Sequence, residues 1–356
     1  MKIKRILVCP LDWGLGHATR DVYIIKKLLD KNNEVILGGD GASLKFLISE
    51  FPGLESIRIP SHRFVYSKIF PAWFMILLQI PAFLKGIFAE HRILRRITNQ
   101  YHIDLVISDA RYGLWNRQIP SIILTHQVRI RLPMFFKFLE IPVHCIHLPA
   151  LNKFSQLWIP DFPGHPNLSG ILSHNIRLPL NSFYIGCLSR FTDYQTAFST
   201  SESYELVLLL SGPEPQRSVF EKMVTAQILQ QSRKSLIIAG QTEYKVSEDL
   251  SLLCRRISFL SGNELFIILK SAKYIICRSG YSTIMDLVAL GKTAFLIPTP
   301  GQPEQEYLAR YLQQKGLFLF SKQKDFILED AIQRLKDFIP PGSPFSAINL
   351  PDELIS

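Results

Sequence analysis

Short apolar runs alternate with helical patterns along this chain, and the alternation occurs twice. In the first half, five runs have the length and composition of buried strands: 3–9, 34–38, 55–59, 104–108 and 120–124. A helical stripe of apolar residues lies between the first two runs. This alternation predicts βα units, in which helices cover both faces of a parallel sheet. We therefore expect an α/β chain with doubly wound sheets.

The second half repeats the pattern after a polar stretch without periodicity. Its strand candidates are 205–210, 235–239, 257–260, 274–277 and 293–297, and helices are expected near 216–231, 263–271, 282–290 and 303–315. A length of 356 residues is enough for two domains. We predict an N-terminal domain over 1–188, a linker up to residue 203, a C-terminal domain over 204–335, and a tail, 336–356, that packs back on the first domain. Two such domains imply a cleft between them, where ligands meet the carboxyl ends of the strands.

The composition narrows the class of partner. A formal net charge of +10 favours a phosphate-bearing ligand, a nucleic acid or an anionic membrane surface. Because no RNA-binding or helix-turn-helix signature accompanies the charge, we expect no nucleic acid. Five cysteines without C-x-x-C spacing predict buried thiols in a reducing, cytoplasmic compartment. His144 and His147 lack a third ligand at a suitable spacing, so we predict no metal site.

Residues 68–97 are the stretch with a membrane-like composition. Their apolar runs are interrupted by proline and lysine and stay shorter than the ~20 residues that a spanning helix needs. Two interpretations stay open: a pair of core-facing helices, or an amphipathic element that lies on a membrane. In the second, aromatic residues enter the lipid and basic residues contact lipid phosphates, namely Trp73, Phe74, Phe83 and Phe88 with Lys85, Arg92, Arg95 and Arg96.

The glycine turn D-W-G-L-G-H-A-T-R, residues 12–20, is the first candidate site. Gly14 and Gly16 permit a tight turn and the close approach of a ligand, and the helix that follows points N–H groups at the same place. His17 could act there as a general base, or its ring could simply be satisfied by backbone. Arg20 could hold an anion or face solvent. The chain lacks the third glycine of the dinucleotide fingerprint, which argues against an NAD-type binding protein, but Asp40 after the second strand keeps that protein as an alternative.

Asp109 follows the strand predicted at 104–108, at the edge of the sheet where ligands bind. We predict that its carboxylate shares the role of base with His17, orients that imidazole, or caps a helix.

In the second half, a serine-glycine turn opens a helix after the strand at 274–277 and supplies hydroxyl and N–H groups suited to a diphosphate. An acidic residue further along that helix can accept ribose hydroxyls. A second turn follows the strand at 205–210, and the arginine after it is either solvated or placed to offset charge on a leaving diphosphate. The candidate donor-binding residues are Ser211, Gly212, Arg217, Arg278, Ser279, Gly280, Ser282, Thr283, Asp286, Gln302, Glu304 and Gln305.

The order G-x-G-H, then S-G-x-x-T-x-x-[DE], then P-x-x-x-[QE]-Q resembles the GT-B glycosyltransferases. It is most similar to the branch with the bacterial N-acetylglucosaminyltransferase of the lipid-linked peptidoglycan precursor and the plant galactolipid synthases. The resemblance implies two Rossmann-like domains that face a central cleft. By position, His17 matches the family's acceptor-side histidine. The family's diphosphate turn matches Ser279, Gly280 and Thr283, and its ribose-binding glutamate matches Asp286. Its two sugar-binding glutamines match Glu304 and Gln305.

The same resemblance implies an inverting hexosyltransferase that moves a sugar from a UDP-linked donor to a hydroxyl acceptor. A lipid-linked acceptor, met at the inner face of the cytoplasmic membrane, would suit residues 68–97 and the positive charge, whereas a soluble acceptor would leave that segment as packing only. No D-x-D triplet occurs, so the helix N-terminus, with Arg217 and Arg278, is expected to stabilise the leaving diphosphate without a metal. We expect no cofactor. The alternatives are a nucleotide-sugar epimerase of the same fold and a non-catalytic nucleotide-binding protein.

Overall fold

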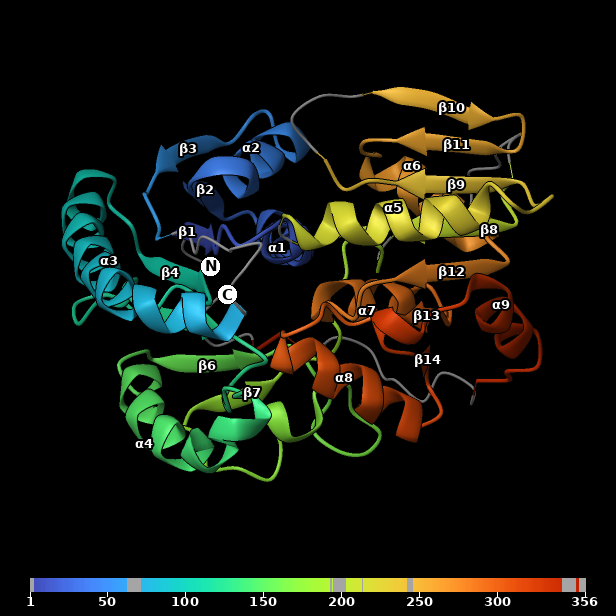
Figure 1. The fold of residues 1–356 in the computed structure, drawn as a ribbon. Helices are drawn as coiled ribbons and strands as arrows, with labels where there is room; N and C mark the ends of the chain where they lie inside the picture. The colour runs from blue at the N-terminus through green and yellow to red at the C-terminus, as the bar shows by residue number, and fades with distance from the viewer. Residues whose placement is uncertain are drawn as a thin grey trace. The chain divides into compact units, whose positions relative to one another are not determined.

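A computed structural model describes residues 3–62, 72–192, 194, 203–212, 214–241, 246–340 and 350–351 (Figure 1). These residues fall into two compact units, the first with the residues up to Arg190 together with 350–351, and the second with the residues from Phe191 to 340. The predicted linker up to residue 203 and the predicted tail, 336–356, lie largely outside the described residues. Their structure therefore stays a prediction.

The described part of the first unit is built on a parallel sheet with the strand order β3-β2-β1-β4-β5-β6-β7. Its strands are β1 (Arg5–Pro10), β2 (Glu34–Gly39), β3 (Glu55–Arg58), β4 (Leu105–Asp109), β5 (Ser121–Leu124), β6 (Gln156–Ile159) and β7 (Ser182–Tyr184). The central strands are buried along most of their length, as expected when helices cover both faces. The winding reverses between β1 and β4, because the chain runs outward to β3 and then returns beside β1.

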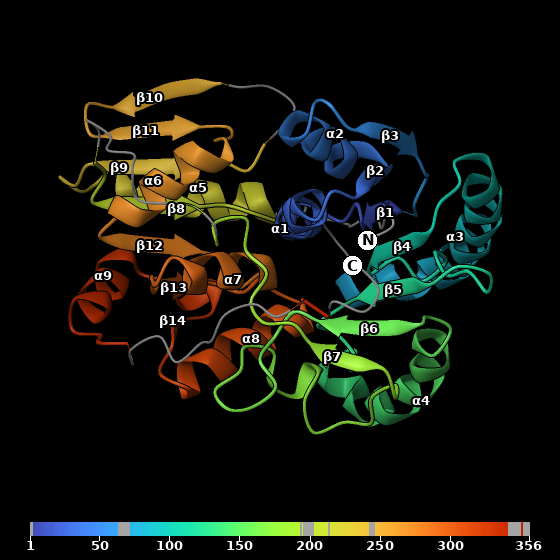
Figure 2. The same cartoon turned by 180° about the vertical axis from the view of Figure 1, so that it is seen from behind.

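Helices cover both faces of this sheet (Figure 2). They are α1 (Gly16–Asp30), α2 (Gly41–Glu50), α3 (Ala72–Gln100), η1 (Met134–Leu139), α4 (Glu140–Leu151) and η2 (Gly170–Leu172). Leu94 and Ile97 of α3 pack with Leu7 and Cys9 of β1 in one buried cluster. Alternate residues of a strand point to opposite faces of the sheet, so each face needs a cover. Helix α1 covers β1 and β2 with its buried side, which includes Ile24.

The second unit repeats this design, with the order β10-β11-β9-β8-β12-β13-β14 in its described residues. The strands are β8 (Leu206–Leu209), β9 (Ser235–Ile238), β10 (Ser247–Ser251), β11 (Cys254–Ile257), β12 (Tyr274–Cys277), β13 (Phe295–Leu296) and β14 (Leu319–Phe320). Only β10 runs antiparallel among them, paired with β11. Here the winding reverses between β8 and β12.

The helices of the second unit are α5 (Gln216–Ile228), α6 (Gly262–Ser271), α7 (Tyr281–Ala289), α8 (Pro303–Gln314), η3 (Gln323–Asp325) and α9 (Leu328–Lys336). Helices α5 and α9 contact each other, and α6 lies on the opposite face of the sheet (Figures 1 and 2). Phe220 and Val224 of α5 pack with Leu206 and Leu208 in the core of this unit.

The predicted α/β class and parallel sheets are confirmed. The strand predicted at 257–260 is wrong by three residues, because β11 covers Cys254–Ile257. This strand contains two arginines, which interrupt the apolar run by which a buried strand is predicted. Each arginine forms an ion pair, Arg255 with Asp249 and Arg256 with Glu221.

Of the two interpretations of residues 68–97, the pair of helices is wrong. The described part, α3, is one helix that continues through Pro81, which lacks an N–H for the helical hydrogen bond. Phe83 is half-buried and Phe88 is 72% exposed, while residues 63–71 and the side chains of Trp73 and Phe74 lie outside the described part of the chain.

Candidate functional site

The candidate site of the first unit lies where the winding reverses, the place where open α/β sheets bind ligands. Pro10 of β1 and Asp109 of β4 are register partners at the carboxyl ends of these neighbouring strands. The loop that leaves β1 turns at Gly14, whose φ of +102° suits glycine, and α1 begins at Gly16. Its N-cap residue, Leu15, makes no side-chain hydrogen bond to the first turn.

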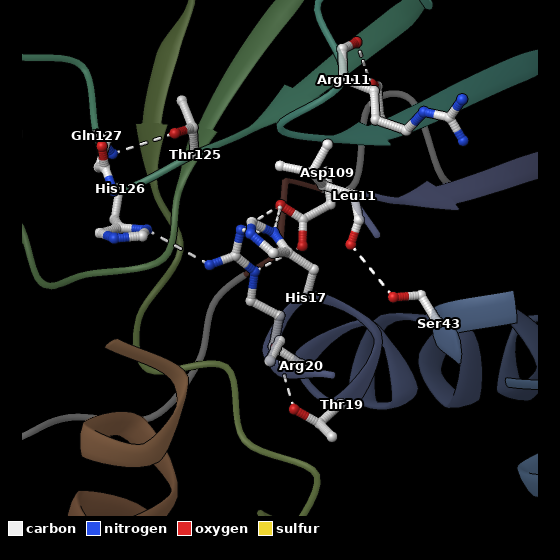
Figure 3. Close-up of polar contacts among 12 residues, drawn as sticks. Leu11, His17, Thr19, Arg20, Ser43, Asp109, Arg111, Thr125, His126 and Gln127 are labelled. Carbon is white, nitrogen blue, oxygen red and sulfur yellow. Dashed lines mark hydrogen bonds and ion pairs between the residues drawn. The ribbon is translucent and has the colours of Figure 1, made fainter. Parts of the chain in front are cut away.

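Helix α2 holds this loop in place through Ser43. The Ser43 N–H donates to Asp12 Oδ1 at 3.0 Å, and its hydroxyl lies 3.3 Å from the carbonyl oxygen of Gly14. The same hydroxyl lies 3.3 Å from the carbonyl oxygen of Leu11 (Figure 3). These contacts fix the backbone on which His17 stands.

His17 lies beside Asp109, as one of the predicted interpretations requires (Figure 3). Its Nδ1 is 3.0 Å from Asp109 Oδ1. The imidazole keeps 20% of its side-chain surface exposed, whereas the carboxylate is fully buried. The histidine is therefore the member of the pair that can meet a ligand.

Both interpretations of Arg20, that it holds a ligand anion or that it faces solvent, are wrong. Its guanidinium is buried and binds a carboxylate of the protein itself. It is 2% exposed and binds Asp109 with two N–H groups, Nε to Oδ2 at 2.7 Å and Nη2 to Oδ1. Its Nη1 lies 3.4 Å from Nδ1 of His126, the histidine that follows β5 (Figure 3). Arg20 is thus a buried partner of the predicted carboxylate.

The charge state of Asp109 follows from these contacts. Burial opposes ionisation, but Arg20 and His17 together hold the pKa of Asp109 well below its usual range. The carboxylate is therefore ionised at neutral pH and has no access to solvent. This arrangement suits orientation of the imidazole better than proton abstraction from an acceptor.

The Nδ1 atom of His17 has two neighbours that demand opposite proton states. Asp109 Oδ1 can only accept a hydrogen bond, whereas Arg20 Nη2, also 3.0 Å away, can only donate one. When Nδ1 carries the proton it donates to Asp109, and Nε2 is then the basic nitrogen.

In the second unit, the predicted donor residues also gather at a reversal of winding, between β8 and β12. Ser211 and Gly212 follow β8, and Gly212 has a φ of +99°. A Cβ at Gly212 would lie 4.0 Å from the hydroxyl of Thr299, which follows β13. Thr299 is 2% exposed, and its Oγ1 has no hydrogen-bond partner among the described residues. Sequence reasoning missed this residue, although a hydroxyl just after a predicted strand was a usable signal.

Arg278 and Arg217 both contact backbone carbonyls. Arg278 is fully buried, and its guanidinium donates to the carbonyls of Ile297, Pro298 and Gln216 at 2.9–3.3 Å. Burial lowers its pKa to about 9. Arg217 donates to the carbonyl of Gly240 at 3.0 Å and to Glu214 at 2.7 Å. Arg278 thus ties the end of β12 to the end of β13 and to α5, while a role of either arginine at a diphosphate stays a prediction.

The serine-glycine turn lies at the start of α7. Gly280 is the N-cap, and a Cβ there would lie 3.9 Å from the Thr283 hydroxyl. Ser279 is buried and donates to the carbonyl of Gln305 at 2.9 Å. Asp286 is 7% exposed on the second turn of α7, and Ser282 is half-buried.

The loop before α8 is organised by its own glutamines. Gln305 accepts from the N–H of Thr299 at 2.9 Å and donates to Gln302 at 2.6 Å. Gln302 is the N-cap of α8, and Glu304 lies in its first turn. The structure therefore connects this loop with the α7 turn through the contact between Gln305 and Ser279.

His144 and His147 of α4 point inward, and a ring nitrogen of each lies 3.1–3.2 Å from the carbonyl of Val128. In the part of the chain that the structure describes, no group of three His, Cys, Asp or Glu side chains could hold a metal ion.

The chain is similar to known glycosyltransferases in sequence and in fold. Residues 213–343 match the glycosyltransferase family 28 C-terminal domain. An uncharacterized glycosyltransferase of Methanosarcina acetivorans is 24% identical over 94% of this chain and 90% of its own length. A UDP-N-acetylglucosamine--N-acetylmuramyl-(pentapeptide) pyrophosphoryl-undecaprenol N-acetylglucosamine transferase of Caldanaerobacter subterraneus is 27% identical over 38% of this chain and 40% of its own. The crystal structure of the glycotransferase of kitacinnamycin matches with a TM-score of 0.64 and 15% identity, over 94% of this chain and 90% of that one, which shows a shared fold.

Proposed function

We propose that this chain, whose residues 213–343 match the glycosyltransferase family 28 C-terminal domain, is a GT-B glycosyltransferase that transfers a sugar from a UDP-linked donor to a hydroxyl acceptor. The first unit would supply the acceptor side and the second unit the donor side. The UDP part of the proposal is supported by the name of the partial relative from Caldanaerobacter subterraneus.

The observation that carries the proposal is the contact between the partly exposed imidazole of His17 and the buried, ionised carboxylate of Asp109. Asp109 holds the proton on Nδ1 and stabilises the imidazolium that forms when Nε2 takes a proton from the acceptor hydroxyl. The sugar C–O bond to the diphosphate breaks as the acceptor oxygen forms its bond to the anomeric carbon, with inversion at that carbon.

On the donor side, the leaving diphosphate must be stabilised as its charge grows. We propose that the uncapped start of α7, with Ser279, Gly280 and Thr283, supplies this stabilisation through N–H and hydroxyl groups. Asp286 would accept the ribose hydroxyls, and Glu304 would contact the sugar. No metal ion takes part in this proposal.

The acceptor in this proposal is lipid-linked, because the first unit exposes apolar side chains on two helical elements. Helix α3 exposes Leu84 and Phe88, and η1 exposes Phe135 and Phe138, the last two at 86% and 73%. Within the described residues, one stretch, Met134–Leu151, is apolar and long enough by composition to cross a membrane, and 22% of it is buried.

The polarity of α4 supports contact with a membrane surface. Its polar residues Glu140, His144 and His147 face the protein interior, while Ile141 and Ile146 face outward. Helix α4 itself has 12 residues, fewer than the ~20 that cross a bilayer. We propose that α3, η1 and α4 rest on the inner face of the cytoplasmic membrane, and that the basic charge of the chain favours anionic lipid.

Release of UDP from UDP-sugars in the presence of extracted bacterial lipids tests the reaction. His17→Ala should lower kcat by about 10²- to 10⁴-fold, the usual contribution of a general base. His102→Asn is the matched control, an exposed histidine with φ of +50° that asparagine tolerates. Turnover that survives in His17→Ala would refute the role of the imidazole. Conversion of one UDP-sugar into another without an acceptor would identify an epimerase. A protein that binds a UDP-sugar but releases no UDP would be a binding module.

Vesicle flotation tests the membrane contact separately. Phe135→Ser with Phe138→Ser should reduce binding to phosphatidylglycerol vesicles, since two large apolar side chains no longer enter the lipid. Unchanged flotation of this variant would show that η1 does not contact the membrane.

A further inference from the structure

A second carboxyl group lies behind the contact between His17 and Asp109. Asp21 is the next residue of α1 after Arg20, and it is fully buried. Neither of its side-chain oxygens has a hydrogen-bond partner among the described residues. The carboxyl of Asp109 on β4 lies within side-chain hydrogen-bonding reach of Asp21. Two carboxylates cannot hydrogen-bond each other unless one of them carries a proton.

The contacts of Asp109 decide where that proton resides. Asp109 already accepts two N–H groups of Arg20 and faces Nδ1 of His17, so it is stabilised as the anion. Burial and the charge of Asp109 raise the pKa of Asp21 well above its usual range, against the opposing effect of Arg20. A fully buried carboxylate without a donor is costly, and such a group neutralises instead.

The charge balance leads to the same assignment. With Asp21 neutral, the positive charge of Arg20 offsets the negative charge of Asp109, and the buried group carries no net charge. Cys9 of β1 interacts electrostatically with Asp21, but burial raises the pKa of this thiol to about 12, so it is neutral and adds no charge. A carboxylate offers about four acceptor positions, so Asp109 can accept one more hydrogen bond.

We infer that Asp21 is a protonated carboxylic acid that donates a hydrogen bond to Asp109, and that it is thereby a positioning residue for His17. The hydrogen bond fixes the carboxylate from the side opposite Arg20. It also withdraws negative charge from the oxygen atoms that the imidazole faces. The stated role of Asp21 in turnover rests on the proposed function, but its protonation does not.

Two variants separate these statements. In Asp21→Asn an amide N–H replaces the carboxylic O–H at nearly the same size, so kcat and its pH profile should stay close to those of the wild type. In Asp21→Ala the donor is lost, and kcat should fall about tenfold, the usual effect of a hydrogen bond to a charged group, with KM for the donor unchanged. The acid limb of the pH profile should move to higher pH, because Asp109 then holds the imidazolium more strongly. An unmoved profile with a lower melting temperature would overturn the positioning role.

Protonation is tested without any assay of activity. The infrared difference spectrum of wild type against Asp21→Asn, on the full chain at pH 7, should show the carbonyl band of one protonated carboxylic acid. The stability of Asp21→Asn relative to the wild type should also increase from pH 4 to pH 7, because folding of the wild type must keep Asp21 protonated while the unfolded chain releases that proton. A spectrum without the band, with a pH-independent difference in stability, would overturn the inference. If the wild type shows the band but turns over no UDP-sugar, the proposed function fails and the protonation stands.

Discussion

Replacing Arg20 with methionine removes one partner of a buried ion pair and leaves the other in place. Arg20 is 2% exposed and Asp109 is fully buried, so no water replaces the lost N–H groups. Breaking a buried pair in this way costs about 3–5 kcal/mol, since the buried carboxylate of Asp109 then lacks a positive partner apart from its contact with His17. We expect the free energy of unfolding of the first unit to fall by that amount at pH 7.5.

The pH dependence of this loss has a definite sign. In the wild type the pKa of Asp109 is lowered, so its contribution to stability is present above the pKa of an unfolded aspartate, about 3.9, and is lost as the pH falls below it. In Arg20→Met burial is no longer opposed by the guanidinium, so the pKa of Asp109 should rise and the carboxyl should take up a proton. The difference in stability between the two proteins should therefore shrink as the pH falls from 7.5 to 4.5.

Urea unfolding followed by tryptophan fluorescence measures this loss. All four tryptophans, Trp13, Trp73, Trp115 and Trp158, precede residue 190, so the signal reports on the first unit alone. Arg58→Met is the matched control, because Arg58 pairs with Asp40 at 2.9 Å while its own side chain is 75% exposed. Such exposed pairs contribute about 0–1 kcal/mol. Equal losses in both variants, or a difference that grows at low pH, would refute the account of the Arg20–Asp109 pair.

Three further substitutions probe the second unit. Ser261→Ala removes the capping box of α6 and should cost about 1 kcal/mol in the unfolding of this unit, measured by circular dichroism; an unchanged midpoint would contradict the cap. Gly240→Ala should destabilise more strongly, because φ is +65° and a Cβ would lie 2.6 Å from the carbonyl oxygen of Leu210; a variant as stable as the wild type would refute that steric argument. Asp286→Ala should weaken UDP binding about tenfold in calorimetry, with Glu248→Ala on exposed β10 as control, and equal affinities would exclude the ribose contact.

Much of the fold could be predicted from the sequence, because most strands of both sheets are short apolar runs with helical stripes between them. The five strand candidates of the first half all form within a residue or two of their expected limits. Strand β10 was not predicted, since four of the five residues of Ser247–Ser251 are polar, most are exposed, and the strand pairs with β11 alone at the edge of the sheet. Strand β6 and helix α4 lie in a proline-rich segment, where local pattern does not separate strand from helix.

The site could be predicted only in part, for a similar reason. Gly14, Gly16, His17 and Asp109 could be predicted because they are flexible or polar residues that follow predicted strands. The partners of Arg20 and Asp21 come from β4, almost ninety positions further along the chain, and no local spacing encodes that contact. The orientation of α4 could not be predicted for another reason. Helices usually bury their apolar side chains, whereas α4 buries histidines and exposes isoleucines.

The most direct test of the central claim is the rate of UDP release from UDP-N-acetylglucosamine with anionic lipid extract as the source of acceptor, measured with and without EDTA. The account predicts that the wild type releases UDP at the same rate in both conditions and that His17→Ala releases almost none. Release that EDTA abolishes, or that His17→Ala retains, would contradict a metal-independent transfer in which His17 is the base.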